Sequence, residues 1–217
     1  RQTIKLMFVT VVDYGSGNLR SVAKALEQAN TDNNLKYSVQ ISSDPNLIKK
    51  SDKVILPGQG SFKDCKEGLL KITGLVEELN NYVLEEKKPI FGICVGMQLF
   101  ATYGLEVEKT NGLNWIKGNV KKINIEDSNF KLPHMGWNEI KVLGKNKYFS
   151  GIKDLEHMYF IHSYEFEPKE ENAIQAYTTY NKKIVAAVEK DNIFGTQFHP
   201  EKSQDNGLKI LGNFLKI

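Results

Sequence analysis

The stretch Pro89-Ile90-Phe91-Gly92-Ile93-Cys94-Val95-Gly96 carries a short apolar run directly into a predicted helix over residues 95–103. The apolar run has the length of a buried strand. Glycine on each side of Cys94 lets the backbone bend sharply without Cβ clashes. The stretch therefore predicts a strand, a tight turn that presents Cys94, and a helix that begins at the next residue.

The segments upstream repeat this alternation of strand and helix. Strands are expected at residues 4–12, 37–41 and 54–56, and helices at residues 19–29, 62–70 and 75–86. The helical assignments rest on apolar residues that recur every three or four positions, and the strands on short β-branched or alternating runs. Strands that alternate with helices imply a mainly parallel sheet covered on both faces.

The second half of the chain has a different pattern. Short β-like pieces are expected at residues 120–125, 158–166, 174–179, 184–189 and 193–197, and an amphipathic helix at residues 207–217. Such closely spaced strands suggest hairpins that extend the sheet in antiparallel fashion. No internal repeat or linker interrupts the pattern, so we expect a single α/β domain over residues 1–217.

Composition narrows the classes of protein that fit. The chain has 217 residues, 41% of them hydrophobic and 25% charged, which is typical of a soluble globular protein. Its net charge of +3 is too small to indicate nucleic acid binding. No signal peptide or membrane-length apolar stretch is evident, and two cysteines do not make a disulfide framework, so we expect a cytoplasmic protein.

The first candidate for chemistry is Cys94, in the pattern glycine-x-nucleophile-x-glycine. A cysteine at a helix N-terminus is stabilised as the thiolate, which is the nucleophilic form. The N–H of Val95 can donate to an oxyanion that forms at the same place. The alternative is a buried cysteine packed between two glycines.

The second candidate is Gln197-Phe198-His199-Pro200-Glu201, far downstream. A cysteine nucleophile needs a base, and the base needs a group that orients it. His199 can exchange the proton, and Glu201 can hold the other ring nitrogen. A surface loop would explain this segment equally well if Cys94 were absent.

The third candidate is the turn Pro57-Gly58-Gln59-Gly60 at the carboxyl end of a predicted strand. Ligands bind beyond such ends in open parallel sheets. The N–H groups of Gly58, Gln59 and Gly60 could complete an oxyanion hole, although a plain turn is the alternative. The turn lacks the Lys-Ser/Thr ending of a phosphate-binding loop.

The remaining polar residues are less specific. His162 lies in a segment that could line a cleft, whereas His157 is interpreted as surface or structural and Cys65 as structural. Residues 136–138 are interpreted as a Gly-Trp-Asn corner that either packs or anchors an interface. No HExxH or CxxC pattern occurs, so no metal site is expected.

Two motifs together resemble the class I (triad) glutamine amidotransferases. They are Gly-Ile-Cys-Val-Gly-Met-Gln at residues 92–98 and Gln-Phe-His-Pro-Glu-Lys-Ser at residues 197–203. Segments 13–19, 134–138 and 159–164 are similar to the glutaminase subunits of imidazole glycerol phosphate synthases. The resemblance implies a flavodoxin-like α/β core and a catalytic triad of Cys94, His199 and Glu201, with no cofactor.

The same resemblance implies further site residues and a partner. Glutamine-binding positions fall on Gln98, Glu106, His162, Ser163 and Tyr164. Positions near a (β/α)8-barrel cyclase, the partner in a heterodimer, fall on Trp137, Asn138 and Lys202. Glutamine would be hydrolysed to glutamate, and the ammonia would pass to the cyclase, which makes imidazole glycerol phosphate and AICAR in histidine biosynthesis.

Three other functions remain open at the level of the sequence. The chain could serve a different acceptor, for example in a surface-sugar pathway, or it could be a stand-alone cysteine hydrolase of γ-glutamyl compounds. It could also be a non-catalytic binding module, although all three triad residues are present. The activity of the isolated chain, compared with its activity beside a cyclase, separates these functions.

Overall fold

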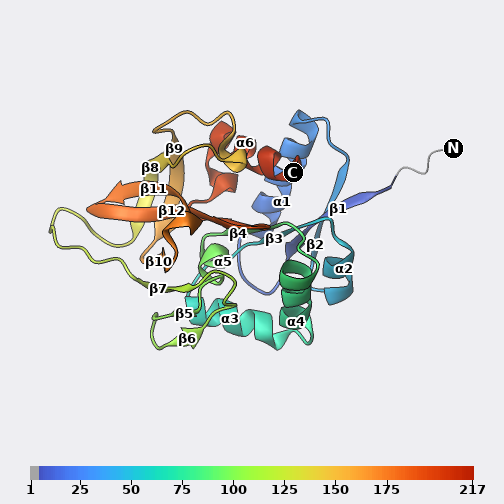
Figure 1. Cartoon of the computed structure of the whole chain (residues 1–217), viewed down its shortest axis with the longest axis horizontal. Coiled ribbons are helices and arrows are strands. Elements are labelled where there is room, and N and C mark those ends of the chain that lie inside the picture. Colours follow the sequence, from blue (N-terminus) through green and yellow to red (C-terminus); the bar gives the residue numbers. More distant parts are fainter. Residues whose placement is uncertain (1–4) are drawn as a thin grey trace.

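The centre of the molecule is a nine-stranded sheet, seen in a computed structural model that describes residues 5–217 (Figure 1). In spatial order the strands are β2 (Tyr37–Ser42), β1 (Met7–Val12), β3 (Lys53–Leu56), β4 (Ile90–Ile93), β13 (Ile193–Thr196), β12 (Lys182–Lys190), β11 (Ile174–Tyr180), β8 (His134–Val142) and β9 (His157–His162). The first five run parallel and the last four pair antiparallel. The predicted mainly parallel sheet with an antiparallel extension is therefore confirmed.

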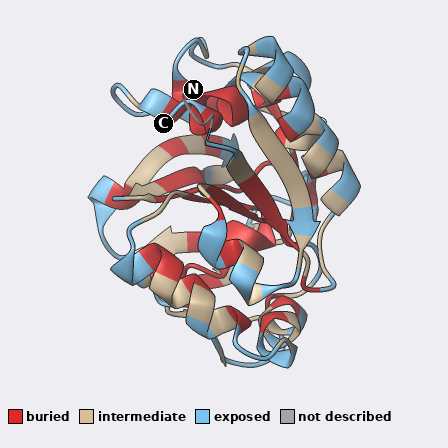
Figure 2. Cartoon of the chain, turned by 90° about the vertical axis from the view of Figure 1, so that its right-hand side faces the viewer, coloured by how far each residue is buried: buried red, intermediate tan, exposed pale blue. Residues whose placement is uncertain are grey.

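Helices cover both faces of the parallel part. One layer is formed by α1 (Leu19–Asp32) and α6 (Gln204–Leu215), and the opposite layer by α3 (Phe62–Lys71) and α4 (Leu75–Asn80), with α2 (Pro45–Lys50) beside α4. Figure 2 shows the central strands buried and the outer helix surfaces exposed. Burial on both faces explains why β1, β3 and β4 are almost continuously apolar. None of the helices within residues 5–217 has the length and hydropathy that a transmembrane span requires.

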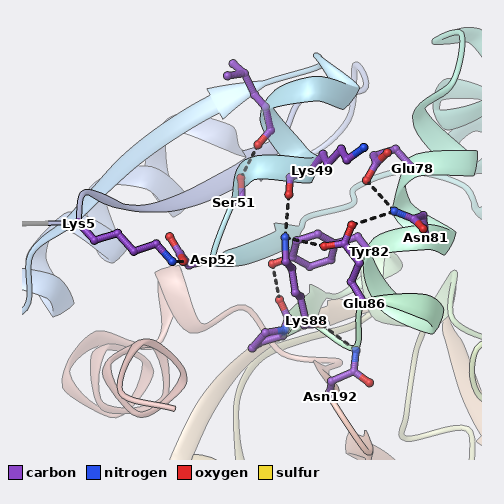
Figure 3. Close-up of polar contacts among 12 residues, drawn as sticks. Lys5, Lys49, Ser51, Asp52, Glu78, Asn81, Tyr82, Glu86, Lys88 and Asn192 are labelled. Atoms are coloured by element: carbon purple, nitrogen blue, oxygen red, sulfur yellow. Dashed lines mark hydrogen bonds and ion pairs between the residues drawn. The ribbon is translucent and has the colours of Figure 1, made fainter.

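The helix predicted over residues 75–86 changes character after α4. It continues as a π-helical segment, Asn81–Glu85, and the Val83 carbonyl near its end accepts a hydrogen bond from the Asn192 side-chain amide at 2.9 Å. The same amide donates to the Lys88 carbonyl at 2.7 Å (Figure 3). These contacts hold together the amino ends of β4 and β13. Because the two strands run parallel, their carboxyl ends lie together at the opposite edge of the sheet.

A second sheet, which the sequence did not predict, lies beside the first. Its strands, in spatial order, are β10 (Tyr164–Pro168), β7 (Gly118–Lys122), β5 (Tyr103–Gly104) and β6 (Thr110–Asn111). The single strand predicted over residues 158–166 is wrong, because the chain leaves β9 of the main sheet at Ser163 and enters β10. The Ser163 carbonyl accepts a hydrogen bond from Ile123 at 2.9 Å, so the crossing point is held at the junction of the two sheets.

The helix predicted over residues 95–103 is also wrong, because α5 (Val95–Gln98) stops after about one turn. The carbonyls that would continue it are taken by a distant segment: Leu113 donates to Leu99 at 2.7 Å and Trp115 donates to Phe100 at 2.9 Å. Gly112 allows this approach, since a Cβ there would lie 2.0 Å from the Ala101 carbonyl oxygen. The chain therefore turns back towards the end of β4.

Other boundaries differ less. Residues 134–138 form the start of β8 rather than a corner, because His134 to Glu139 pair residue by residue with β9. The first strand begins at Met7, and its predicted start, residue 4, lies outside the described residues. Strand β7 ends at Lys122 rather than at residue 125, and α6 begins at Gln204 rather than at residue 207. These changes extend the antiparallel part of the sheet and leave the parallel part as predicted.

Candidate active site

Cys94 lies on the sharp turn between β4 and α5, as predicted. Its φ of 55° and ψ of −115° belong to a region that L-residues with a side chain rarely adopt. The turn packs closely on the neighbouring strand, since a Cβ on Gly96 would lie 1.9 Å from the Leu56 carbonyl oxygen. Only glycine fits there, and the packing fixes the strained backbone that presents the Cys94 sulfur.

Strand pairing brings the distant His199 to Cys94. Ile93 of β4 pairs with Thr196 of β13, and the Cys94 N–H donates to the Thr196 carbonyl at 2.8 Å. The chain then turns, and the His199 N–H donates to the Tyr159 carbonyl at 2.9 Å. Parallel strands that end at the same edge of a sheet thus place the sulfur and the imidazole in one crevice.

Glu201 orients the His199 ring from the following 3-10 turn, Pro200–Lys202. His199 Nδ1 lies 2.7 Å from Glu201 Oε1, and both side chains are at least 95% buried. His199 Nε2, on the other side of the ring, is buried without a hydrogen bond to any residue in the range 5–217. That nitrogen is therefore available for proton transfer.

The electrostatics favour a charged pair between the two side chains. Burial alone would lower the pKa of His199, but the charges of Cys94 and Glu201 and the hydrogen bond to Glu201 raise it to about 10. The imidazolium form is stabilised by a neighbouring thiolate and a carboxylate. The pKa of His199 is thus higher in the folded protein than the ordinary value of histidine. Protonated His199 therefore stabilises the folded state fully below that ordinary value, and this stabilisation is lost as the pH rises through about 10.

This raised pKa predicts an unusual titration for His199. An NMR titration of its ring should show the imidazolium retained at about pH 8 and lost only as the pH rises to about 10. Glu201→Gln should lower the midpoint, because it removes one of the two charges that raise this pKa. A midpoint near the ordinary histidine value in the unmodified protein would contradict the pairing.

A cavity of about 360 Å³ opens beside these two side chains. Every predicted substrate position lines it: Gln98, Glu106, His162, Ser163 and Tyr164. Glu106 is brought there by the early end of α5, and its carboxylate accepts the Phe62 N–H of α3 at 2.9 Å. Pro133 and Ile161 also line the cavity and were not predicted, because only the tertiary structure brings their segments to it.

Three of the four predicted oxyanion residues, Val95, Gln59 and Gly60, line the cavity beside Cys94. Gly58 packs behind the turn, where a Cβ would lie 2.5 Å from the Gly96 nitrogen. The Gln59 N–H donates instead to the Ser16 hydroxyl at 2.9 Å, and that hydroxyl donates to the Gln59 carbonyl at 2.6 Å. Gln59 is therefore held by the loop after β1, and its N–H is not directed at Cys94.

Gln197 is a site residue that the sequence reasoning did not single out. It is fully buried, and its amide nitrogen lies 3.6 Å from the Cys94 sulfur. The signal was present, since Gln197 follows the strand that pairs with β4 and stands two residues before His199. Its amide therefore supplies a hydrogen-bond donor to the Cys94 sulfur.

Of the three predicted partner positions, the structure brings two together. Trp137 is 48% exposed on β8, its ring is edge-on to that of Tyr159 at 5.9 Å, and the Lys202 ammonium lies 5.7 Å from the Tyr159 ring. Met135, 61% exposed, lies on the same face of β8 as Trp137. Asn138 is on the opposite face, where its amide donates to the Thr179 carbonyl, and its place at an interface stays a prediction.

The other singled-out residues lie away from the Cys94–His199 pair. His157 is exposed on β9, and Cys65 is buried with its sulfur 3.2 Å from the Ser16 hydroxyl. Across residues 5–217, no group of three or more His, Cys, Asp or Glu side chains is arranged to hold a metal ion.

Comparison with known proteins gives a consistent result. Residues 10–217 match the family described as glutamine amidotransferase class-I. The chain is 54% identical to imidazole glycerol phosphate synthase subunit HisH of Pelagibacter ubique, over 97% of this chain and all of that protein. It is 45% identical to the subunit of the same name in Brucella suis, over 97% and 99%. The crystal structure of a glutamine amidotransferase from Thermotoga maritima has a similar fold, with a TM-score of 0.62 and 17% identity over 91% of this chain and 77% of that chain.

Proposed function

The chain belongs to the class I glutamine amidotransferases, and we propose that it hydrolyses glutamine and supplies the ammonia to a cyclase subunit in histidine biosynthesis. The observation that carries the proposal is the arrangement at the carboxyl ends of β4 and β13. There a strained Cys94 and a His199 oriented by Glu201 share one cavity. Relatives that are subunits of imidazole glycerol phosphate synthase, matched over nearly their whole length, support the pathway.

In the proposed mechanism, the Cys94 sulfur attacks the side-chain amide carbon of glutamine. The N–H groups of Val95 and Gly60 stabilise the tetrahedral oxyanion, and each such donor contributes roughly 3 kcal/mol. Protonated His199 gives its Nε2 proton to the departing nitrogen, which leaves as ammonia, and a glutamyl thioester remains. His199 then takes a proton from water, the resulting hydroxide attacks the thioester, and glutamate and the thiolate are released.

The substrate would be held by the polar groups that line the cavity. The Glu106 carboxylate complements the α-ammonium of glutamine, and Gln98 with residues 162–164 supplies amide and backbone hydrogen bonds. Such a set recognises a free amino acid rather than a glutaminyl residue within a protein, because a peptide-bonded nitrogen would carry no charge for Glu106 to pair with.

The partner would be a (β/α)8-barrel cyclase that forms a heterodimer with this chain. Met135, Trp137, Tyr159 and Lys202 make a surface suited to it, because two exposed apolar side chains and a cation–aromatic pair are common at interface centres. Direct transfer also has a chemical reason, since ammonia loses its nucleophilicity once it is protonated in water. We further propose that the chain acts as a single amidotransferase domain in the cytoplasm.

A glutaminase assay with and without a (β/α)8-barrel cyclase subunit tests the proposal. Glutamate release should be slow for the isolated chain and should rise at least about tenfold when the cyclase and its nucleotide ligand are added. Trp137→Ala should weaken the complex and raise the cyclase concentration needed for half-maximal stimulation, since interface tryptophans often contribute at least about 2 kcal/mol. Equal turnover with and without the cyclase would contradict the partner and favour a stand-alone hydrolase.

A further inference from the structure

The carbonyl oxygen of Tyr164, at the wall of the cavity, joins two sets of buried polar side chains. His162 Nδ1 lies 2.8 Å from it on one side, and Gln98 Nε2 lies 3.1 Å from it on the other. His162 Nε2 is in turn 2.8 Å from Nδ1 of His134, which does not line the cavity. Both histidines and Gln98 are at least 94% buried.

This carbonyl determines which ring nitrogens carry protons. A carbonyl can only accept, so His162 must carry its proton on Nδ1, and its Nε2 must be an acceptor. His134 must therefore donate from Nδ1, and its Nε2 accepts from Asn138 at 3.0 Å. Burial lowers the pKa of His162 to about 3 and that of His134 to about 4, which agrees with two neutral rings.

Asn138 closes the outer end of the chain with its amide orientation fixed. Its Nδ2 group donates to the Thr179 carbonyl at 2.9 Å as well as to His134, and its Oδ1 accepts from the Glu139 N–H at 2.8 Å. An amide in the opposite orientation would direct an oxygen at the Thr179 carbonyl. Asn138 therefore requires His134 to accept at Nε2 and donate from Nδ1. The Tyr164 carbonyl, acting through His162, requires the same roles of the His134 nitrogens.

The inner side of the same carbonyl reaches the nucleophile. Gln98 must direct its amide nitrogen at Tyr164, and that nitrogen also donates to Gln197 Oε1 at 3.0 Å. The Gln197 nitrogen is thereby left to contact the Cys94 sulfur at 3.6 Å. The Gln98 oxygen has no donor within the described part of the chain and belongs to a residue that lines the cavity. It is the natural acceptor for a substrate N–H.

We propose that His134, with Asn138 behind it, is a positioning residue for glutamine binding that acts through His162 and the Tyr164 carbonyl on Gln98. This inference rests on the proposed function. Without the His134 donor, the proton of His162 can move to Nε2, and an unprotonated Nδ1 would then face the Tyr164 carbonyl. That repulsion would displace the carbonyl, and Gln98 would lose the acceptor that fixes its amide.

Substitutions at position 134 test the proposal by the split between KM and kcat. His134→Leu removes both ring nitrogens at similar volume and should raise the KM for glutamine about tenfold or more, with a smaller effect on kcat. His134→Asn places an amide donor near the position of Nδ1 and should restore most of the affinity. Thr178→Val is the matched control, because it removes an equally buried hydrogen bond, to the Glu139 carbonyl at 2.8 Å, on the adjacent strand β11.

A second measurement keeps this test separate from that of the proposed function. In a Cys94→Ala background, calorimetry should show His134→Leu weakening glutamine binding by the same factor, and this readout needs no turnover. If the chain with Cys94 intact shows no turnover, but His134→Leu still weakens glutamine binding, the proposed function fails and the positioning role of His134 stands. Equal KM and binding for His134→Leu and the parent, with a lower melting temperature alone, would overturn the inference, and absence of glutamine binding would overturn both.

Discussion

Cys94→Ala should abolish glutamine hydrolysis, with a loss of at least about 10⁴ in kcat, because removing the nucleophile of a comparable triad removes nearly all of its chemical catalysis. The substitution keeps the Cβ and removes one sulfur atom from a residue that already lines a cavity. We therefore expect the free energy of unfolding to change little. Glutamate release measured with the cyclase present, together with thermal unfolding, checks both statements.

The same variant carries a second expected result at His199. The charge of Cys94 is the largest of the influences that raise the pKa of this imidazole, so the pKa should fall well below about 10 when the sulfur is absent. An NMR titration of the His199 ring would follow the change. Retained turnover in Cys94→Ala would exclude Cys94 as the nucleophile whatever the titration shows.

Cys65→Ser is the matched control for the loss of a thiol. Cys65 is as buried as Cys94 but lies beside Ser16, outside the cavity that holds His199. The variant should keep most of its glutaminase activity, and a glutamine-analogue electrophile should still label Cys94 in it. Loss of labelling in this variant, with the fold intact, would show that the two thiols are not separate in function.

Gly207→Ala should destabilise the protein by about 1–3 kcal/mol or more, which is the usual cost of forcing an extra carbon into a packed site. A Cβ on Gly207 would lie 1.8 Å from the Pro200 carbonyl oxygen, a backbone atom that cannot rotate away. Alanine is favoured over glycine within a helix by about 1 kcal/mol, so the clash must outweigh that gain. Urea unfolding at a fixed temperature measures the net change.

The clash should also lower activity, since Pro200 begins the turn that carries Glu201. Displacing this turn would lengthen the contact between Glu201 and His199, now 2.7 Å. Gly212→Ala, on the same helix, is the matched control. A Cβ there meets only the end of the Asn33 side chain, at 2.5 Å, which can move aside. Equal stability and activity in the two variants would show that Gly207 is not held against the turn.

Local chemistry let the sequence predict most of the parallel part of the fold and the triad itself. Apolar periodicity located α1, α3, β1, β3 and β4, because each of these elements buries one stripe or both faces of its own residues. The glycines around Cys94 predicted the strained turn. Proximity in the chain predicted the pairing of His199 with Glu201, two residues apart.

Contacts between distant segments decided what the sequence could not predict. The helix after Cys94 stops because Leu113 and Trp115 supply donors to its last carbonyls, and no local property of residues 95–103 reveals this. The Gln59 N–H was one of the expected oxyanion donors, yet the Ser16 hydroxyl, from another strand end, accepts it.

By itself, the sequence determined the parallel core, the strained Cys94 and the His199–Glu201 pair, since side-chain pattern and turn residues act over a few positions. Only the tertiary structure decided the second sheet, the place of Pro133 and Ile161 in the cavity wall, and the hydrogen-bond chain from Asn138 through His134 to His162. These depend on the register of β8 against β9 and on the turn at Ser163, which bring together groups that no sequence spacing relates. A buried donor or acceptor must find a partner wherever the fold offers one, and the partner is often far away in the chain.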